Sequence, residues 1–179
     1  MDTTSRDILD FWIDAGPGKW FNGGEAFDRE CDRRFREIHF TAARRECEDW
    51  LATPEGGLAL LILLDQIPRN IFRGSGHAFA SDGLALHYAR TMVAAGVDRT
   101  FDDDLRAFVY LPFEHSEALA DQHESVRLFA DVDNADYRAY AQAHFDVIAR
   151  FGRFPHRNAA LGRANTDDEQ AWLDAGGGF

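Results

Sequence analysis

The stretch RFGRFPHRNAALGR, residues 150 to 163, concentrates positive charge in an acidic chain. It contains four arginines, a histidine and an asparagine but no Asp or Glu, whereas the whole chain carries a formal net charge of -12. The guanidinium of arginine is a planar fork of N–H donors that fits a carboxylate or a phosphate. Pro155 can begin a helical turn whose free backbone N–H groups add to the positive potential. The stretch is therefore a candidate site for an anionic group.

A second stretch, LDQIPRNIFRG (residues 64 to 74), repeats features of the first. Each places an apolar residue and Pro, then Arg-Asn, then a Gly and an Arg, with one residue inserted in the later copy. Each also has two arginines four residues apart, which on a helical turn puts like charges side by side and calls for a counter-charge. We expect two related corners. The candidate ligand-binding residues are Arg69, Asn70, Arg73, Asp82, Arg153, Arg157, Asn158 and Arg163.

The segment FVYLPFEHSE, residues 108 to 117, supplies groups for proton transfer. Its Glu114, His115 and Glu117, with His156 of the arginine-rich stretch, are the candidate catalytic residues. A histidine beside carboxylates can act as a general acid or base near neutral pH, because its pKa is easily shifted. Adjacent residues on a helix point in different directions, however. The alternative is that these side chains cap or brace a helix start.

Two sources can neutralise the arginines. One is internal, from carboxylates such as Asp65, Asp82, Glu114 and Glu117, and the other is a bound ligand. We favour the internal source somewhat, because networks of arginine and carboxylate that hold helix corners together are commoner than binding sites.

Motifs for metals and nucleotides are absent from the sequence. None of the histidines forms H-E-x-x-H, and the two cysteines, Cys31 and Cys47, do not have zinc-site spacing. There is no G-x-G-x-x-G after a strand and no phosphate loop with its lysine. We predict no metal site and no cofactor, although a metal-binding group assembled only by the fold stays open.

The excess of acidic residues, 31 against 19 basic ones, excludes some partners. Non-specific binding to nucleic acid or to an anionic membrane needs positive potential spread over a surface. The opening MDTTSRDILD lacks the basic start and apolar run of a signal peptide, and Leu58 to Leu64 is too short to cross a bilayer. We expect a cytoplasmic protein that binds neither nucleic acid nor membrane, with both cysteines as reduced thiols.

Helical periodicity runs through the chain, and no segment alternates with the period of a strand. Thr53-Pro54 starts a helix over residues 54 to 66 that is apolar on all sides and therefore buried. Pro112 is expected to open a longer helix, and the run from Thr166 to Glu169 is a capping box. We predict an all-α fold of antiparallel helical hairpins, forming one domain over residues 1–179 with room for two lobes.

Four long segments carry a family resemblance: LALLILLDQIPRNIFRG, FVYLPFEHSE, RFGRFPHRNAALGR and TDDEQAWL. Together they resemble an uncharacterised bacterial family, the domain of unknown function 924, over nearly the whole chain. The resemblance implies an all-helical, tetratricopeptide-like array, and it implies no established reaction. The likeness to tetratricopeptide proteins is architectural, because the chain has neither their 34-residue period nor their W-x-x-L-G signature.

Two hypotheses of function follow from these residues. In the first, the chain binds a small anionic ligand in a cleft lined by Arg, His and Glu, as an enzyme or as a sensor. In the second, it is a non-catalytic helical module that binds a protein partner, and the Arg-Asn corners are a structural network. A cleft where both corners meet the Glu114–Glu117 segment would favour the first. Burial of these residues in mutually satisfied pairs would favour the second.

Overall fold

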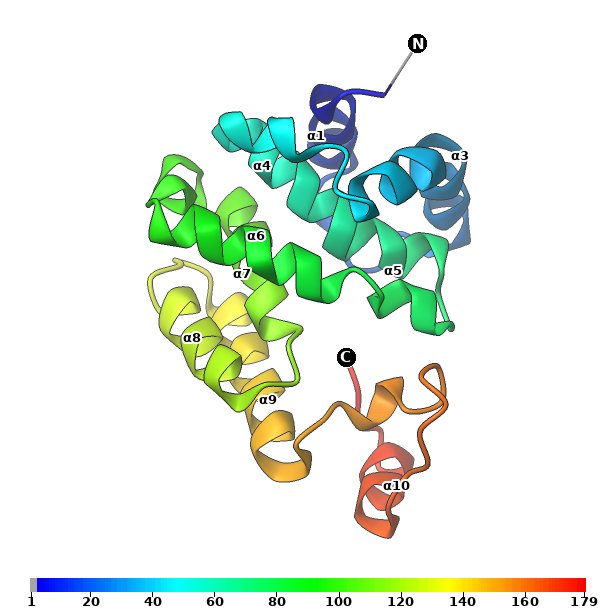
Figure 1. The fold of residues 1–179 in the computed structure, drawn as a ribbon. Helices are drawn as coiled ribbons and strands as arrows, with labels where there is room; N and C mark the ends of the chain where they lie inside the picture. Colours follow the sequence, from blue (N-terminus) through cyan, green and yellow to red (C-terminus); the bar gives the residue numbers. More distant parts are fainter. Residues whose placement is uncertain (1–2) are drawn as a thin grey trace.

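The computed structural model describes residues 3–179, and helices account for all of the regular structure within them (Figure 1). The α-helices are α1 (Ser5–Ala15), α2 (Pro17–Trp20), α3 (Gly24–Ala43), α4 (Pro54–Leu61), α5 (Ile67–Ile71), α6 (Asp82–Ala94), α7 (Asp103–Glu114), α8 (Leu119–Phe129), α9 (Ala135–Phe151) and α10 (Asp167–Asp174). Short 3-10 turns are η1 (Glu48–Ala52), η3 (Gly76–Phe79), η4 (Val97–Thr100) and η5 (Pro155–Arg157), and η2 (Ile62–Gln66) is a π-helical turn.

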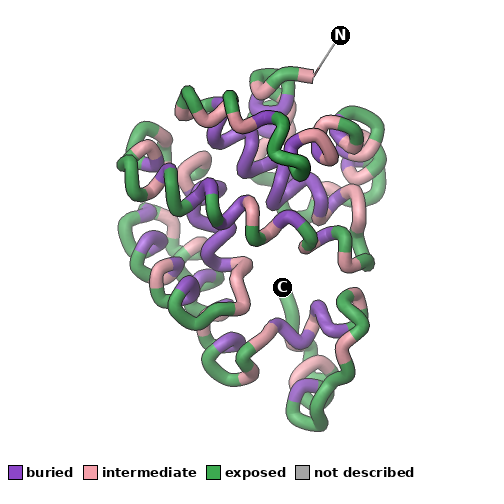
Figure 2. Tube along the Cα trace, in the orientation of Figure 1, coloured by how far each residue is buried: buried purple, intermediate pink, exposed green. Residues whose placement is uncertain are grey.

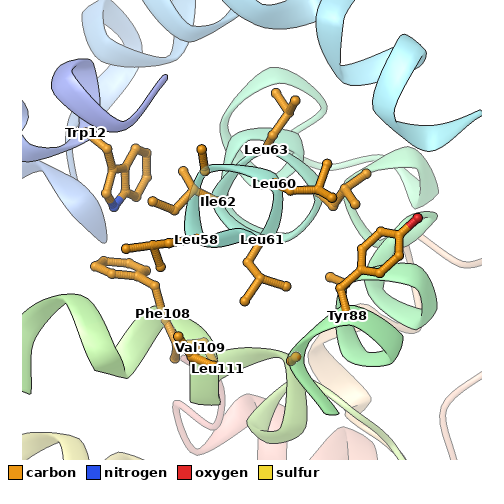
Figure 3. Close-up of a cluster of buried hydrophobic side chains, with 14 of the residues drawn as sticks. Trp12, Leu58, Leu60, Leu61, Ile62, Leu63, Tyr88, Phe108, Val109 and Leu111 are labelled. Atoms are coloured by element: carbon orange, nitrogen blue, oxygen red, sulfur yellow. The ribbon is translucent and has the colours of Figure 1, made fainter. Parts of the chain in front are cut away.

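The centre of the molecule is the continuous segment formed by α4, η2 and α5. Thr53 caps its start by accepting a hydrogen bond from the Gly56 backbone N–H, and residues 56 to 66 are all buried (Figure 2). Figure 3 shows its leucines and isoleucine pointing outward on every side, toward Trp12, Phe108 and Tyr88. The predicted buried helix is confirmed. It has no polar face because other helices cover all of its sides.

Other helices pack around this segment and on one another. Helix α1 packs on α4 and α3 packs on α5, while α6 contacts α7, α7 contacts α8 and α8 contacts α9. The prediction of an all-α fold is confirmed for the described residues. The tetratricopeptide-like hairpin array stays a prediction. No helix in residues 3–179 has both the length and the apolar character needed to cross a membrane.

Helix α10 covers a smaller apolar cluster of its own. Val147, Ile148 and Phe154 are buried there, with Trp172 of α10 packed against them. The predicted capping box is present, because Thr166 accepts from the Glu169 N–H and the Glu169 carboxylate accepts from the Thr166 N–H. After α10 the chain turns back, and its end lies between α10 and the rest of the molecule in Figure 1.

The prediction for Pro112 was wrong. Pro112 lies inside α7, near its end, and the next helix begins only at Leu119. Proline in a helix interior removes one backbone hydrogen bond and crowds the preceding turn. Here the last residues of α7, from Ala107 to Glu114, are all buried. The packing of that turn against the core outweighs the local preference of proline for a helix start.

Both cysteines are unpaired, as the sequence predicts, and both are buried. Cys31 lies in the core with Phe27 and Phe35, one turn away on either side along α3. Burial, followed by the negative charge of Asp28, raises the pKa of the Cys31 thiol to about 12.

Candidate functional site

The π-helical turn η2 brings a carboxylate into the middle of the molecule. Asp65 is only 1% exposed, and its Oδ1 lies 2.8 Å from Nδ1 of His115, which directly follows α7. Burial opposes ionisation, but the charge of Arg69 and the contact with His115 hold the pKa of Asp65 below its usual value. An ionised carboxylate only accepts hydrogen bonds. Nδ1 of His115 therefore carries the hydrogen, and its Nε2 keeps a lone pair.

The two arginine corners meet at Asp82, the first residue of α6. From the first corner, Arg69 donates to both carboxylate oxygens of Asp82 at 3.0 Å. From the second, Nη1 of Arg157 donates to Asp82 at 3.4 Å and to the His115 carbonyl at 2.9 Å. Arg69 and Arg157, one from each corner, thus lie beside Asp82, and Arg157 also reaches His115. Arg69 and Arg157 are far apart in the sequence, so it is the fold that brings them together.

Arg157 has the least satisfied guanidinium of this group. Its head lies over the rings of Phe79 and Phe154, at 4.7 and 4.4 Å from their centroids. Its Nε is buried and has no hydrogen-bond acceptor in residues 3–179. Burial, together with the nearby charge of Arg69, lowers the pKa of Arg157 to about 10. Arg157 nevertheless stays cationic at neutral pH.

A cleft of about 280 Å³ opens at this junction. Its polar lining comes from Asp82, His115, Ser116, Glu117 and Arg157, which α6, the loop after α7 and η5 contribute. Its apolar lining consists of Phe79, Leu86, Pro112 and Leu161. A concave site with apolar walls and a few convergent polar groups is the usual form of a small-molecule site.

Several of the predicted ligand-binding residues instead form ion pairs or hydrogen bonds with other residues of the chain. Arg73 pairs with Asp28 of α3, and Arg153 binds the Glu169 carboxylate with both Nε and Nη2. Arg163 forms a two-pronged pair with Glu117 at 2.7 and 2.8 Å. The side-chain N–H groups of Asn70 and Asn158 also donate within the chain, to the carbonyl of Gln66 and to Asn165.

Two of the predicted catalytic residues have restricted surroundings. Glu117 accepts from Arg163 and also from the Phe154 backbone N–H at 2.8 Å, so both of its oxygens are occupied. His156 packs against the Phe154 and Phe179 rings. Burial, followed by the charge of Arg157, lowers the pKa of His156 to about 4. Their catalytic roles stay predictions.

Next to His115 lies a buried pair that the sequence reasoning did not assemble. The Glu114 carboxyl is 3.2 Å from Nδ1 of His144, on α9, and both side chains are almost completely buried. Burial, with a contribution from Asp65, raises the pKa of Glu114 to about 8. Burial likewise lowers the pKa of His144 to about 3. The one signal in the sequence was that His144 falls on the apolar stripe of its helix.

Comparison with known proteins establishes the family to which this chain belongs. Residues 8–177 match the sequence profile of the family described as "Bacterial protein of unknown function (DUF924)". The chain belongs to the DUF924 family. A solved structure, that of a protein of unknown function from Agrobacterium tumefaciens, is 46% identical in sequence to this chain and superposes on it with a TM-score of 0.92. The alignment covers 96% of this chain and 97% of that one. No curated protein matches this DUF924 chain.

Proposed function

We propose that this DUF924 protein binds a small anionic molecule in the cleft beside Arg157. The observation that supports this most directly is the state of the Arg157 guanidinium. Of its donor groups, only Nη1 donates to an acceptor in residues 3–179; Nη2 has no acceptor there, and Nε is buried without one. A buried cation with unused donors gains more from a ligand oxygen than a solvated one does, because the surroundings screen it less.

Arg157 shares its internal counter-charge, the Asp82 carboxylate, with Arg69. Asp82 already accepts both fork hydrogen bonds of Arg69, and its contact with Arg157 is longer, at 3.4 Å. The nearby Glu117 is taken by Arg163. A carboxylate or phosphate group in the cleft would therefore find a cation that no residue neutralises by itself.

The size and lining of the cleft favour a compact ligand. A volume of about 280 Å³ is at the lower end for small-molecule sites. The walls formed by Leu86, Pro112 and Leu161 suit a short carbon skeleton. His115 and Ser116 stand beside Arg157 in the lining and can contact other polar groups of the ligand. We infer a small organic acid or phosphate ester as the class of ligand.

For the other arginines of the corners, the contacts support the hypothesis of a structural network. Arg73, Arg153 and Arg163 each have a dedicated carboxylate partner. We propose that these pairs hold the corners in place, and that Arg157 alone among the four contacts the ligand. The paired arginines can therefore serve as controls when Arg157 is substituted.

The test is thermal unfolding of the wild-type protein with inorganic phosphate and with succinate, each against NaCl of equal ionic strength. A ligand at ten times its Kd stabilises a protein by about 1.4 kcal/mol. For a chain of this size we expect a rise in Tm of roughly 3 to 6 °C. Arg157→Gln should abolish that rise.

Arg73→Gln is the matched control, because Arg73 belongs to the other corner but pairs with Asp28 outside the cleft. It should leave the response to anions unchanged. If no anion raises the Tm above the NaCl baseline, or if Arg157→Gln responds as the wild type does, the proposed function is wrong.

A further inference from the structure

We propose that Glu114, His115 and His144 form a site for a divalent transition-metal ion. One ligand atom from each residue lies within 4.8 Å of the ligand atoms of the other two. The three residues come from the end of α7, the residue that follows it and the middle of α9. The helices α7 and α9 are in contact, so the site joins two rigid elements. This inference rests on residues other than Arg157 and does not depend on anion binding.

Each of the two histidines has the hydrogen bond from one ring nitrogen that metal ligands usually have. A metal-binding histidine almost always donates its other ring N–H to a carboxylate or a backbone carbonyl, which fixes the tautomer. His115 Nδ1 donates to Asp65 at 2.8 Å, and His144 Nδ1 donates to the Tyr140 carbonyl at 2.8 Å. Both rings therefore keep a lone pair on Nε2. Asp65 and the Tyr140 carbonyl would be the outer partners of the site.

Glu114 supplies an independent reason to expect a ligand. Its side chain is 4% exposed, and its Oε1 lies 3.2 Å from Nδ1 of His144, whose hydrogen already points to the Tyr140 carbonyl. A buried carboxyl group without a hydrogen-bond donor is costly. Coordination of a metal ion would satisfy it.

The donor set indicates the class of metal. Two imidazole nitrogens and one carboxylate oxygen suit Zn²⁺, Fe²⁺ and their first-row neighbours, whereas Mg²⁺ and Ca²⁺ prefer oxygen alone. Three protein ligands leave at least one coordination position for water or a substrate atom. His115 also lines the cleft, so it connects the metal site to the place where a small molecule would bind.

Aromatic rings form an apolar wall around His144. The Phe179 ring stacks on its imidazole with 3.6 Å between the ring centroids, and Phe154 meets it edge-on at 5.5 Å. An apolar shell that restricts water is part of how a protein controls the properties of a bound metal.

The experiment is titration of metal-free, full-length protein with ZnCl2 by isothermal calorimetry, with the absorption spectrum of bound Co²⁺ as a second readout. We expect one equivalent of Zn²⁺ to bind. Glu114→Gln should weaken binding by at least about tenfold, the smaller effect seen even for outer partners of metal sites. Glutamine matches the shape of a neutral carboxyl group, so the fold should be kept. His144→Gln should have the same effect and provides a second variant if the first fails to fold.

His87→Ala is the control for adventitious binding, because His87 is exposed on α6 and should contribute nothing. Arg73→Gln should also bind Zn²⁺ like the wild type, because Arg73 pairs with Asp28 away from these three residues. Absence of Zn²⁺ binding by the wild-type protein would overturn the inference. So would equal Zn²⁺ affinity in the wild type and in both ligand variants.

Discussion

Individual side chains show where sequence reasoning succeeds and where it stops. The repeated Pro and Arg-Asn pattern predicted two related corners, and Arg69 and Arg157, one from each corner, both contact Asp82. The partners of Arg73 and Arg153 were not predictable, because Asp28 and Glu169 become neighbours only through tertiary packing. The same holds for His144: its place on an apolar stripe does not reveal that Glu114 faces it.

Removal of the Arg157 side chain should be destabilising. Arg157→Ala would leave Asp82 with Arg69 alone, which Asp65 also contacts, and it would remove the group packed between two aromatic rings. Because Asp82 keeps its partner Arg69, the cost should be about 2 to 3 kcal/mol, the upper part of the usual range for a single substitution. We expect a loss of that order in the free energy of unfolding, measured with urea.

The comparison for that measurement is Arg73→Ala. Its pair with Asp28 involves an exposed arginine, and exposed pairs contribute about 1 kcal/mol or less. Equal losses in the two variants would mean that the buried junction at Asp82 does not stabilise the fold as we describe.

At the scale of helices, capping residues located helix starts correctly, whereas a proline did not. Thr53 and Thr166 each cap a helix as predicted from the sequence, since a cap depends only on residues nearby. Pro112 misled because burial of the last turn of α7 overrode its local preference. The π-helical turn η2 was also missed, because nothing in its apolar sequence separates it from an ordinary helix.

Helix α10 should lose its anchor in acid. Glu169 accepts from Arg153 and from the Thr166 N–H, and these contacts lower its pKa to about 2. A carboxyl group whose pKa is lower in the folded state stabilises the fold fully above its unfolded pKa, near 4.5. That contribution is lost as the pH falls toward about 2.

The difference in Tm between the wild type and Glu169→Gln should therefore be present at neutral pH and should shrink steadily over the acidic range. Asp168→Asn changes an exposed acid in the same helical turn and controls for the loss of charge alone. A Tm difference for Glu169→Gln that does not vary with pH would contradict the assignment.

For the molecule as a whole, the helical class and the buried position of α4 followed from the sequence because both depend on composition and periodicity. The order of packing around α4 did not. Several helices have comparable apolar faces, and periodicity does not specify which faces meet. Contact between α1 and α4, and between α3 and α5, is set by the combined shape of the core.

The central segment should therefore be the point at which the fold is most sensitive to loss of volume. Leu61 is fully buried, and truncation of such a leucine costs about 2 to 5 kcal/mol. We expect Leu61→Ala to fall in that range in urea unfolding. Leu119→Ala, at a leucine that is 45% exposed, should change the free energy of unfolding by no more than about 0.5 kcal/mol. Similar losses at the two positions would contradict the central role of α4.

The π-helical turn also makes this site depend on chain length as well as on side-chain identity. Residues along an α-helix are spaced by about 100° of rotation, and a π turn accommodates one extra residue without ending the helix. Deletion of one residue from Ile62–Gln66 would rotate everything that follows in α5 relative to α4 by that angle. Arg69 would then no longer point toward Asp82. The protein should therefore tolerate some substitutions in this turn that keep its length, but not the deletion of a residue from it.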